Sequence, residues 1–199
     1  MKSHFARTAT IATATALSAL ILAGCTFNLG PQNPPPQGQS KQDQADQSPG
    51  RMNAAVMFAQ MMIPHHQQAV DLGTLAETRA SSPAVKALAA KIKAEQAPEI
   101  SLMKGWLKDA GIDPDRGMGH MGHGMDGMLT GSQMSELETA KGKVFDSLFL
   151  TRMIAHHEGA VQMAKEVETS GDAKLAKLAK AIIKSQTEQI AYMKELKKK

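Results

Sequence analysis

Hydrophobic side chains recur along residues 52–79 at alternating steps of four and three, which is the spacing of one buried face of an α-helix. The inward series is Phe58, Met62, His65, Ala69, Leu72 and Ala76. Pro64 falls inside this series, where a proline removes a backbone hydrogen bond and kinks the axis, or where a new helix starts. The pattern therefore predicts a helix that places a histidine on its buried face.

A second helix is predicted from Pro83 to about Ala110. Ser82 suits the N-cap, a proline suits the first helical position, and Gly111 is a good C-terminal stop. The expected inward positions are Val85, Leu88, Ile92, Gln96, Glu99 or Ile100, Met103, and Trp106 or Leu107. Polar side chains thus interrupt this apolar face near its middle.

Two more long helices are predicted at about 143–169 and 173–197, separated by a turn at 170–172. A short helix at about 132–140 precedes them. The inward positions of the last helix are Leu175, Leu178, Ile182, Gln186, Gln189 or Ile190, and Met193. No alternating pattern of a β-strand occurs, so the chain is expected to be all-α.

A sequence repeat relates the two helix pairs. Residues 61–70, MMIPHHQQAV, reappear as residues 152–161, RMIAHHEGAV, at an offset of 91 (156 − 65). Each copy carries Met, Ile and two adjacent histidines. Two helical hairpins related by a repeat predict an antiparallel four-helix bundle over residues 51–199.

The N-terminal region is predicted to be a lipoprotein signal peptide followed by a tether. Residues 1–24 have a basic start and an apolar stretch, and the segment Leu22–Cys25 resembles a lipobox, so Cys25 is the expected lipidated residue. An ordinary signal peptide, with Cys25 left as a free thiol or removed, is the alternative. Residues 25–50 are rich in Pro, Gln, Gly and Ser and are expected to be a disordered tether. The expected location is the bacterial cell envelope, facing the periplasm or the exterior.

Charge and cysteine content exclude several classes of protein. The net charge is +4, and removing Lys2 and Arg7 with the leader leaves 21 basic against 19 acidic residues. That balance does not support nucleic-acid binding. A single cysteine permits no internal disulfide. The membrane is expected to be contacted through the lipid alone, and a homo-oligomer or a copper donor or acceptor protein as partner stays open.

Both hairpins are predicted to place imidazole and amide or carboxylate groups in one layer. His65 lies level with Gln96 and Glu99, and His156 lies level with Gln186 and near Gln189. Adjacent helical residues diverge by about 100°, so one histidine of each pair can face the interior and the other a neighbouring helix or solvent. The sequence does not tell which.

Imidazole with thioether predicts copper, since thioether suits Cu(I) and imidazole accepts Cu(I) or Cu(II). Zinc gains little from methionine, and the paired Glu-x-x-His motifs of di-iron bundles are absent. The expected ligands are His65, His66, His156, His157, Met62 and Met153, with Met61, Met103, Met193 and Glu99 nearby. The alternative is a layer that pairs with itself and fixes the register of the bundle.

A Met/His/Gly-rich loop at 115–131 joins the hairpins. Its methionines and histidines alternate with glycine, which precludes a regular element. Weaker, exchangeable copper capture is expected there, from Met118, His120, Met121, His123, Met125 and Met128. A plain flexible linker is the alternative.

Two Met-Ile-x-His-His segments and a Gln-x-x-Glu-Ile-x-x-Met-x-x-Trp-Leu run at 96–107 resemble the family of domain of unknown function 305, over about residues 52–196. The resemblance implies a ferritin-like helical bundle and periplasmic copper binding linked to copper tolerance. Gln189 stands where the first hairpin has Glu99, so the two halves need not bind equivalently.

The leading hypothesis is a lipid-anchored envelope protein that binds Cu(I) or Cu(II) for sequestration, buffering or delivery. A copper-dependent oxidase is a second hypothesis, and it would need an open coordination position. The sequence offers no nucleophile triad or dinucleotide-binding loop, so a binding role is preferred to an enzyme. A metal-free helical interaction module is the third.

Overall fold

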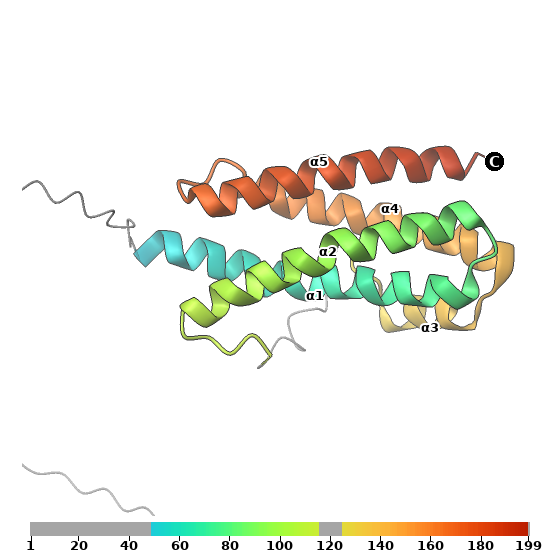
Figure 1. Ribbon diagram of the computed structural model, residues 1–199, viewed down its shortest axis with the longest axis horizontal. Helices are drawn as coiled ribbons and strands as arrows, with labels where there is room; N and C mark the ends of the chain where they lie inside the picture. The colour runs from blue at the N-terminus through green and yellow to red at the C-terminus, as the bar shows by residue number, and fades with distance from the viewer. Residues whose placement is uncertain (1–48, 116–124, 199) are drawn as a thin grey trace, which may run out of the picture. The chain divides into compact units, whose positions relative to one another are not determined.

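The computed structural model describes residues 49–115 and 125–198. Its helices are α1 (Pro49–Arg79), α2 (Pro83–Asp109), α3 (Gly131–Thr139), α4 (Gly142–Lys165) and α5 (Ala173–Leu196), and these ranges contain no strand (Figure 1). None of these helices is both long enough and apolar enough to cross a membrane. The lipobox with Cys25, most of the predicted tether, and residues 116–124 of the loop lie outside the described residues.

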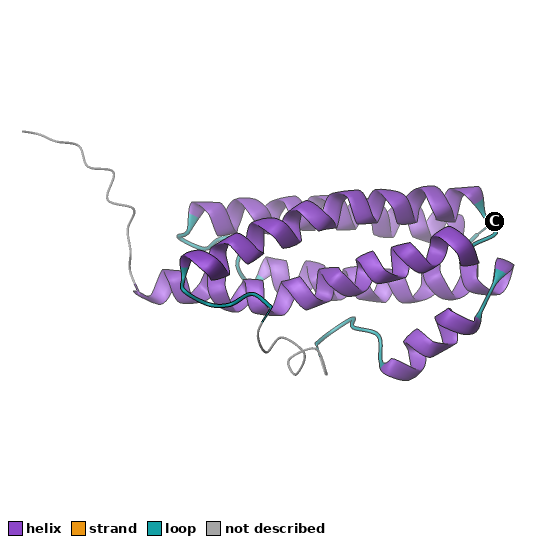
Figure 2. Ribbon diagram, turned by 60° about the horizontal axis from the view of Figure 1, so that its bottom comes forward, coloured by secondary structure: helices purple, strands orange, loops and turns teal. Residues whose placement is uncertain are grey.

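Four of the helices form the predicted antiparallel bundle. α1 pairs with α2 and α4 pairs with α5, each through a short turn, and the short α3 lies on the outside of α4 (Figures 1 and 2). An ion pair of 3.1 Å between Arg152 and Glu136 joins α4 to α3, and Leu137 of α3 is fully buried. The all-α four-helix prediction is therefore confirmed.

Helix boundaries agree with the sequence-based expectations except at two places. α4 ends at Lys165 rather than near Thr169, and a turn follows it. Pro64 lies inside α1, so a helix starting anew at this proline is wrong. Ser82 caps α2 as expected, with its hydroxyl 3.4 Å from the amide of Val85.

The hydrophobic core is divided in two along the bundle. One cluster joins the N-terminal halves of α1 and α5 to the C-terminal halves of α2 and α4, and includes Phe58, Met62 and Met103. The other joins the remaining halves and includes Leu72, Phe149 and Met153. Between the clusters lie the buried polar side chains of His65, His66, Gln96, His156, His157, Gln186 and Gln189.

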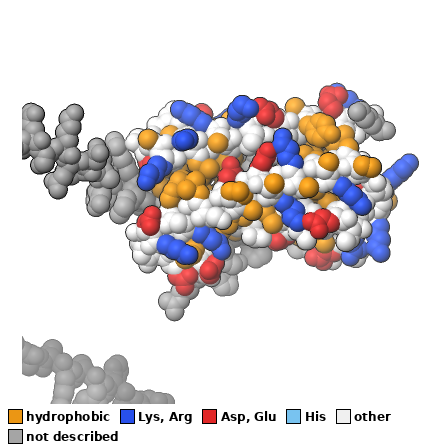
Figure 3. All heavy atoms as spheres, viewed as in Figure 1, with side chains coloured by type: hydrophobic (Ala, Val, Ile, Leu, Met, Phe, Trp, Pro, Cys, Tyr) orange, Lys and Arg blue, Asp and Glu red, His pale blue; other side chains and the backbone are white. Residues whose placement is uncertain are grey.

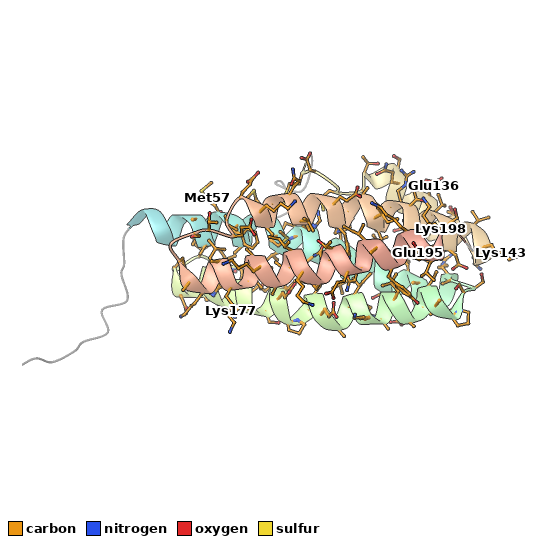
Figure 4. The ribbon with its side chains drawn as sticks, turned by 90° about the horizontal axis from the view of Figure 1, so that it is seen from above. Met57, Glu136, Lys143, Lys177, Glu195 and Lys198 are labelled. Carbon is orange, nitrogen blue, oxygen red and sulfur yellow. The ribbon has the colours of Figure 1, made fainter. Side chains whose placement is uncertain are left out.

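The connection from α2 to α4 starts and finishes at opposite ends of the bundle. α2 ends in the first core cluster, where Leu107 lies, whereas α4 begins in the second, where Phe145 lies. Figure 4 shows Lys143 of α4 and Met57 of α1 at opposite ends. The described part of this crossover, residues 125–141, buries Leu129 in the second cluster. One long crossover between two hairpins is the connectivity of ferritin-like bundles.

A buried carboxylate fastens the α1–α2 turn to the second hairpin. Asp146 of α4, 9% exposed, accepts hydrogen bonds from the Ser81 amide (3.1 Å), the Ser81 hydroxyl (2.6 Å) and the Ser82 amide (3.0 Å). The negative charge also lies beside the N-terminus of α2, where the helix dipole favours it. Asp146 therefore links the two hairpins at one end of the bundle.

We predict that Asp146→Ala lowers the free energy of unfolding by about 2 kcal/mol, because three hydrogen bonds to a charged group are lost together. Urea unfolding followed by circular dichroism measures the change. Ser147→Ala, a substitution at the exposed neighbour, is the control and should stay within about 0.5 kcal/mol of the wild type. Equal stability of the two variants would show that the link contributes nothing.

Candidate functional site

All four histidines of the repeat are fully buried at mid-length of the bundle, each with 0% of its surface exposed. Accordingly, the face drawn in Figure 3 shows interspersed acidic and basic side chains and no histidine. The rings of His65 and His156 meet between α1 and α4, with centroids 3.8 Å apart and planes tilted by 38°. This contact brings the two copies of the repeat together.

The second histidine of each pair turns towards the other helix of its own hairpin. His66 Nε2 lies 2.8 Å from Glu99 Oε2 of α2, and His157 Nε2 lies 2.6 Å from Gln189 Oε1 of α5. The sequence left open which histidine of each pair faces outward and whether it meets a neighbouring helix or solvent. His66 and His157 are these histidines, and both face a neighbouring helix. Glu99 and Gln189 are equivalent in space, as expected from the sequence.

The crossover also reaches this layer. His65 Nε2 donates to the backbone carbonyl of Asp126 at 3.3 Å. Met125 and Met128, two of the predicted loop ligands, are partly buried on either side of that contact. The end of the Met/His/Gly-rich loop thus lies against the buried histidines. The other predicted loop ligands are Met118, His120, Met121 and His123, and they lie outside the described residues.

Two positions that match in the repeat hold the crossover in place. The Gln68 amide donates to the Leu129 carbonyl (3.1 Å) and accepts from the Leu129 amide (2.8 Å). Gly159 occupies the corresponding position on α4, and a Cβ there would lie 1.9 Å from the Asp126 carbonyl oxygen. Sequence reasoning missed both residues. The available signal was that the two copies differ here, Gln against Gly.

Many polar atoms of the layer have no hydrogen-bond partner among the described residues. These are Nδ1 of His65, His66 and His157, both ring nitrogens of His156, both amide atoms of Gln96, and Oε1 of Gln186. A buried polar group without a partner is costly. Self-pairing within the layer therefore accounts for only part of its polar atoms.

Burial lowers the pKa values of three of these imidazoles, those of His65, His156 and His157. It lowers the pKa of His65 to about 3, and repulsion from His66 adds to the effect. It lowers the pKa of His157 to about 4. The pKa of His156 also lies well below its ordinary value, through burial and then the neighbouring His65. Neutral imidazoles at physiological pH each keep one nitrogen lone pair, which is the form that binds metals.

Thioethers flank the layer on both sides. Met62 and Met103 are fully buried in one core cluster, and Met153 and Met193 are fully buried in the other, whereas Met61 is partly exposed. Across residues 49–115 and 125–198, no three His, Cys, Asp or Glu side chains are grouped as a metal site. The chemistry available at mid-bundle is therefore imidazole nitrogen with thioether sulfur close by along the helices.

Two similar hairpins that bury the histidines of both copies in one layer define a class of duplicated four-helix bundles. The chain belongs to the family described as Domain of unknown function (DUF305), whose model matches residues 55–197. The family resemblance found in the sequence is thereby confirmed. Among proteins of curated function, none matches this chain.

Solved structures of similar proteins share the fold. A DUF305 protein from Streptomyces coelicolor, described as a candidate secreted protein, is 36% identical with a TM-score of 0.64, over 72% of this chain and 91% of that chain. CopM in the Cu(II)-bound form is 36% identical (TM-score 0.63), over 71% of this chain and 94% of that chain. CopM in the Cu(I)-bound form is 34% identical (TM-score 0.59), with the same coverage.

We predict opposite effects for two glycine-to-alanine substitutions in helices. Gly105→Ala has open space around the new methyl group and should stabilise the protein by about 0.5–1 kcal/mol. Gly159→Ala must displace the crossover and should destabilise it by about 1–3 kcal/mol. Hydrogen exchange of the Leu129 amide should also become faster in the second variant alone. Equal effects of the two substitutions would rule out tight docking of the crossover.

The histidine pKa values predict acid sensitivity of the metal-free protein. The unfolded chain takes up protons on His65 and His157 below pH 6.5, whereas the folded protein takes them up there only near pH 4 and below. Stability should therefore fall as the pH drops from 6.5 to 4, by about 1.4 kcal/mol per pH unit for each histidine. Urea unfolding with a chelator present measures this, and the slope should be smaller in a His65→Gln/His156→Gln variant. A flat profile between pH 7 and 5 would contradict the prediction.

Proposed function

We propose that this protein binds copper in the polar layer of its bundle, through His65, His66, His156 and His157 with the thioethers of Met62 and Met153. The observation that carries the proposal is the set of four fully buried histidines. Five of their ring nitrogens have no partner among the described residues, and such nitrogens are costly unless something binds them. The lowered pKa values of His65, His156 and His157 support it further, because protons do not compete for the ring nitrogens of these three residues at neutral pH.

The choice of copper rests on the ligand chemistry. Thioether is a soft ligand that suits Cu(I), and imidazole suits both oxidation states, whereas zinc and iron gain little from methionine. The similarity to CopM supports the same choice, because that protein has been solved with Cu(I), Cu(II) and silver bound. Silver(I) shares the preference of Cu(I) for soft ligands. Met61, Met103, Met193 and Glu99 would complete or adjust the site.

The biological role we assign is sequestration, buffering or delivery of copper in the cell envelope. The signal-like leader and the lipobox at Cys25 support export and lipid anchoring, and the candidate secreted relative supports export. Methionine and neutral histidine bind copper without a thiol, which suits an oxidising compartment. The Met/His/Gly-rich loop would capture ions close to the bundle, because Asp126 at its C-terminal end contacts His65.

Anaerobic titration with Cu(I) against a competing chelator tests the proposal on the chain from Pro49 onward. Replacing His65, His66, His156 and His157 together by Gln should weaken binding by at least ~100-fold, since losing an outer partner of a ligand alone costs about 10- to 100-fold. A loop variant with Met118, His120, Met121 and His123 changed to Ser should lose only the weaker phase. Circular dichroism checks that both variants remain helical.

Two results would overturn this assignment. If only the loop variant loses copper, the bundle histidines are structural and the loop is the binding site. If the wild type binds Cu(I) no better than an unrelated helical protein, the metal-free interaction module replaces copper binding. Steady consumption of oxygen with Cu(I) as reductant would instead favour the oxidase hypothesis.

A further inference from the structure

Three of the four buried histidines contact an oxygen atom through the same ring nitrogen. The contacts run from His65 Nε2 to the Asp126 carbonyl (3.3 Å), from His66 Nε2 to Glu99 Oε2 (2.8 Å), and from His157 Nε2 to Gln189 Oε1 (2.6 Å). Carbonyl and amide oxygens can only accept a hydrogen bond. Nε2 therefore carries the proton in His65 and His157, and a neutral ring then leaves the lone pair on Nδ1.

For His157 this assignment depends on which way the Gln189 side chain is turned. A glutamine amide can present either its oxygen or its NH2 group, and the two groups have nearly the same shape. The Gln189 NH2 group donates to Glu95 Oε2 of α2 at 2.6 Å. A carboxylate accepts only, so this contact fixes the NH2 group on the α2 side and turns the amide oxygen towards His157.

We propose that Glu95 is a positioning residue for the histidine layer: it orients the Gln189 amide, which holds His157 as the Nε2–H tautomer and leaves Nδ1 free to bind a metal. The last step rests on the proposed copper function, whereas the tautomer does not. Sequence reasoning did not single out Glu95, which lies one residue before the buried Gln96.

A carboxylate is linked to the second histidine of each pair, directly in one hairpin and through an amide in the other. In the first hairpin the Glu99 carboxylate touches His66 directly. In the second hairpin, Gln189 takes the equivalent place and contacts His157. The carboxylate of Glu95 contacts Gln189 and so reaches the histidine only through this amide. Both carboxylates come from α2, four residues apart on one helix. α2 therefore provides the anionic partner for the histidines of both hairpins.

The surroundings of Glu95 explain why its loss should matter. Gln189 lines a groove between α2 and α5 together with Leu88, Lys91 and Tyr192. In the absence of the carboxylate, water in the groove could accept from the Gln189 NH2 group or, with the amide turned over, donate to its oxygen. The His157 tautomer would then no longer be fixed. The other contact of Glu95 is an exposed ion pair of 3.6 Å with Lys91, and such pairs contribute little.

The first arm of the test measures tautomers in the metal-free full chain, labelled with 15N-histidine and studied at neutral pH by long-range 1H–15N correlation. We expect a protonated Nε2 and a bare Nδ1 for His157. Glu95→Ala should give a mixture of tautomers. Glu95→Gln should restore the wild-type pattern, because its amide oxygen can still accept from Gln189. Lys91→Ala removes only the surface ion pair and should leave the spectrum unchanged.

The second arm adds Cu(I) anaerobically to the same samples. The Nδ1 resonance of His157 should shift while the Nε2 proton is retained, and Glu95→Ala should weaken Cu(I) binding by about 10- to 100-fold, with Lys91→Ala unchanged. A wild-type His157 protonated on Nδ1, an unaltered tautomer in Glu95→Ala, or Cu(I) bound through Nε2 would each overturn the proposal. If the tautomers are as stated but Cu(I) does not bind, the copper function fails and the positioning role of Glu95 stands.

Discussion

The contact between the rings of His65 and His156, with centroids 3.8 Å apart, joins the two hairpins in the middle of their hydrophobic core. Hydrocarbon lies on both sides of this contact, so burial lowers the pKa values of His65, His156 and His157, and a polar atom in the layer is costly unless it has a partner. This need for partners determines where the second histidine of each pair lies. It also determines the positions of the amide and carboxylate groups of α2 and α5. Any slip of one helix would leave these groups opposite apolar side chains, so the layer also fixes the helical register.

The crossover from α2 to α4 is the second element that this layer organises. It passes the seam between α1 and α4 at the height of the histidines, where the Asp126 carbonyl accepts a hydrogen bond from His65 Nε2. The Gln68 side-chain amide makes two hydrogen bonds to the Leu129 backbone, as a neighbouring β-strand would. The absence of a side chain at Gly159 leaves room for the Asp126 backbone. The long connection therefore completes the polar layer on the side that neither α2 nor α5 covers.

Most of the bundle could be predicted from the sequence, because the four-and-three spacing, the Ser82 cap and the repeat are local signals. The level of His65 with Gln96 and Glu99, and of His156 with Gln186 and Gln189, followed from hairpin geometry. The crossover contacts did not, since a glycine needed for close approach looks like any helical glycine until its neighbour is known. Burial of both histidines in each pair depends on two neighbouring helices at once. The roles of Glu95 and Asp146 depend on contacts with distant parts of the chain, Gln189 and Ser81, which no local pattern encodes.

The difference between Gln68 and Gly159 has a consequence for how such a bundle can evolve by substitution. Two identical hairpins could assemble as a symmetric dimer, but every substitution would then appear on both sides of the two-fold axis. The two positions could not then differ, although the crossover needs a hydrogen-bonding side chain on α1 and room for its backbone on α4. Joining the hairpins in one chain lifts that restriction and lets each half carry its own residue. Covalent fusion thus makes an asymmetric cover possible over a nearly symmetric interior.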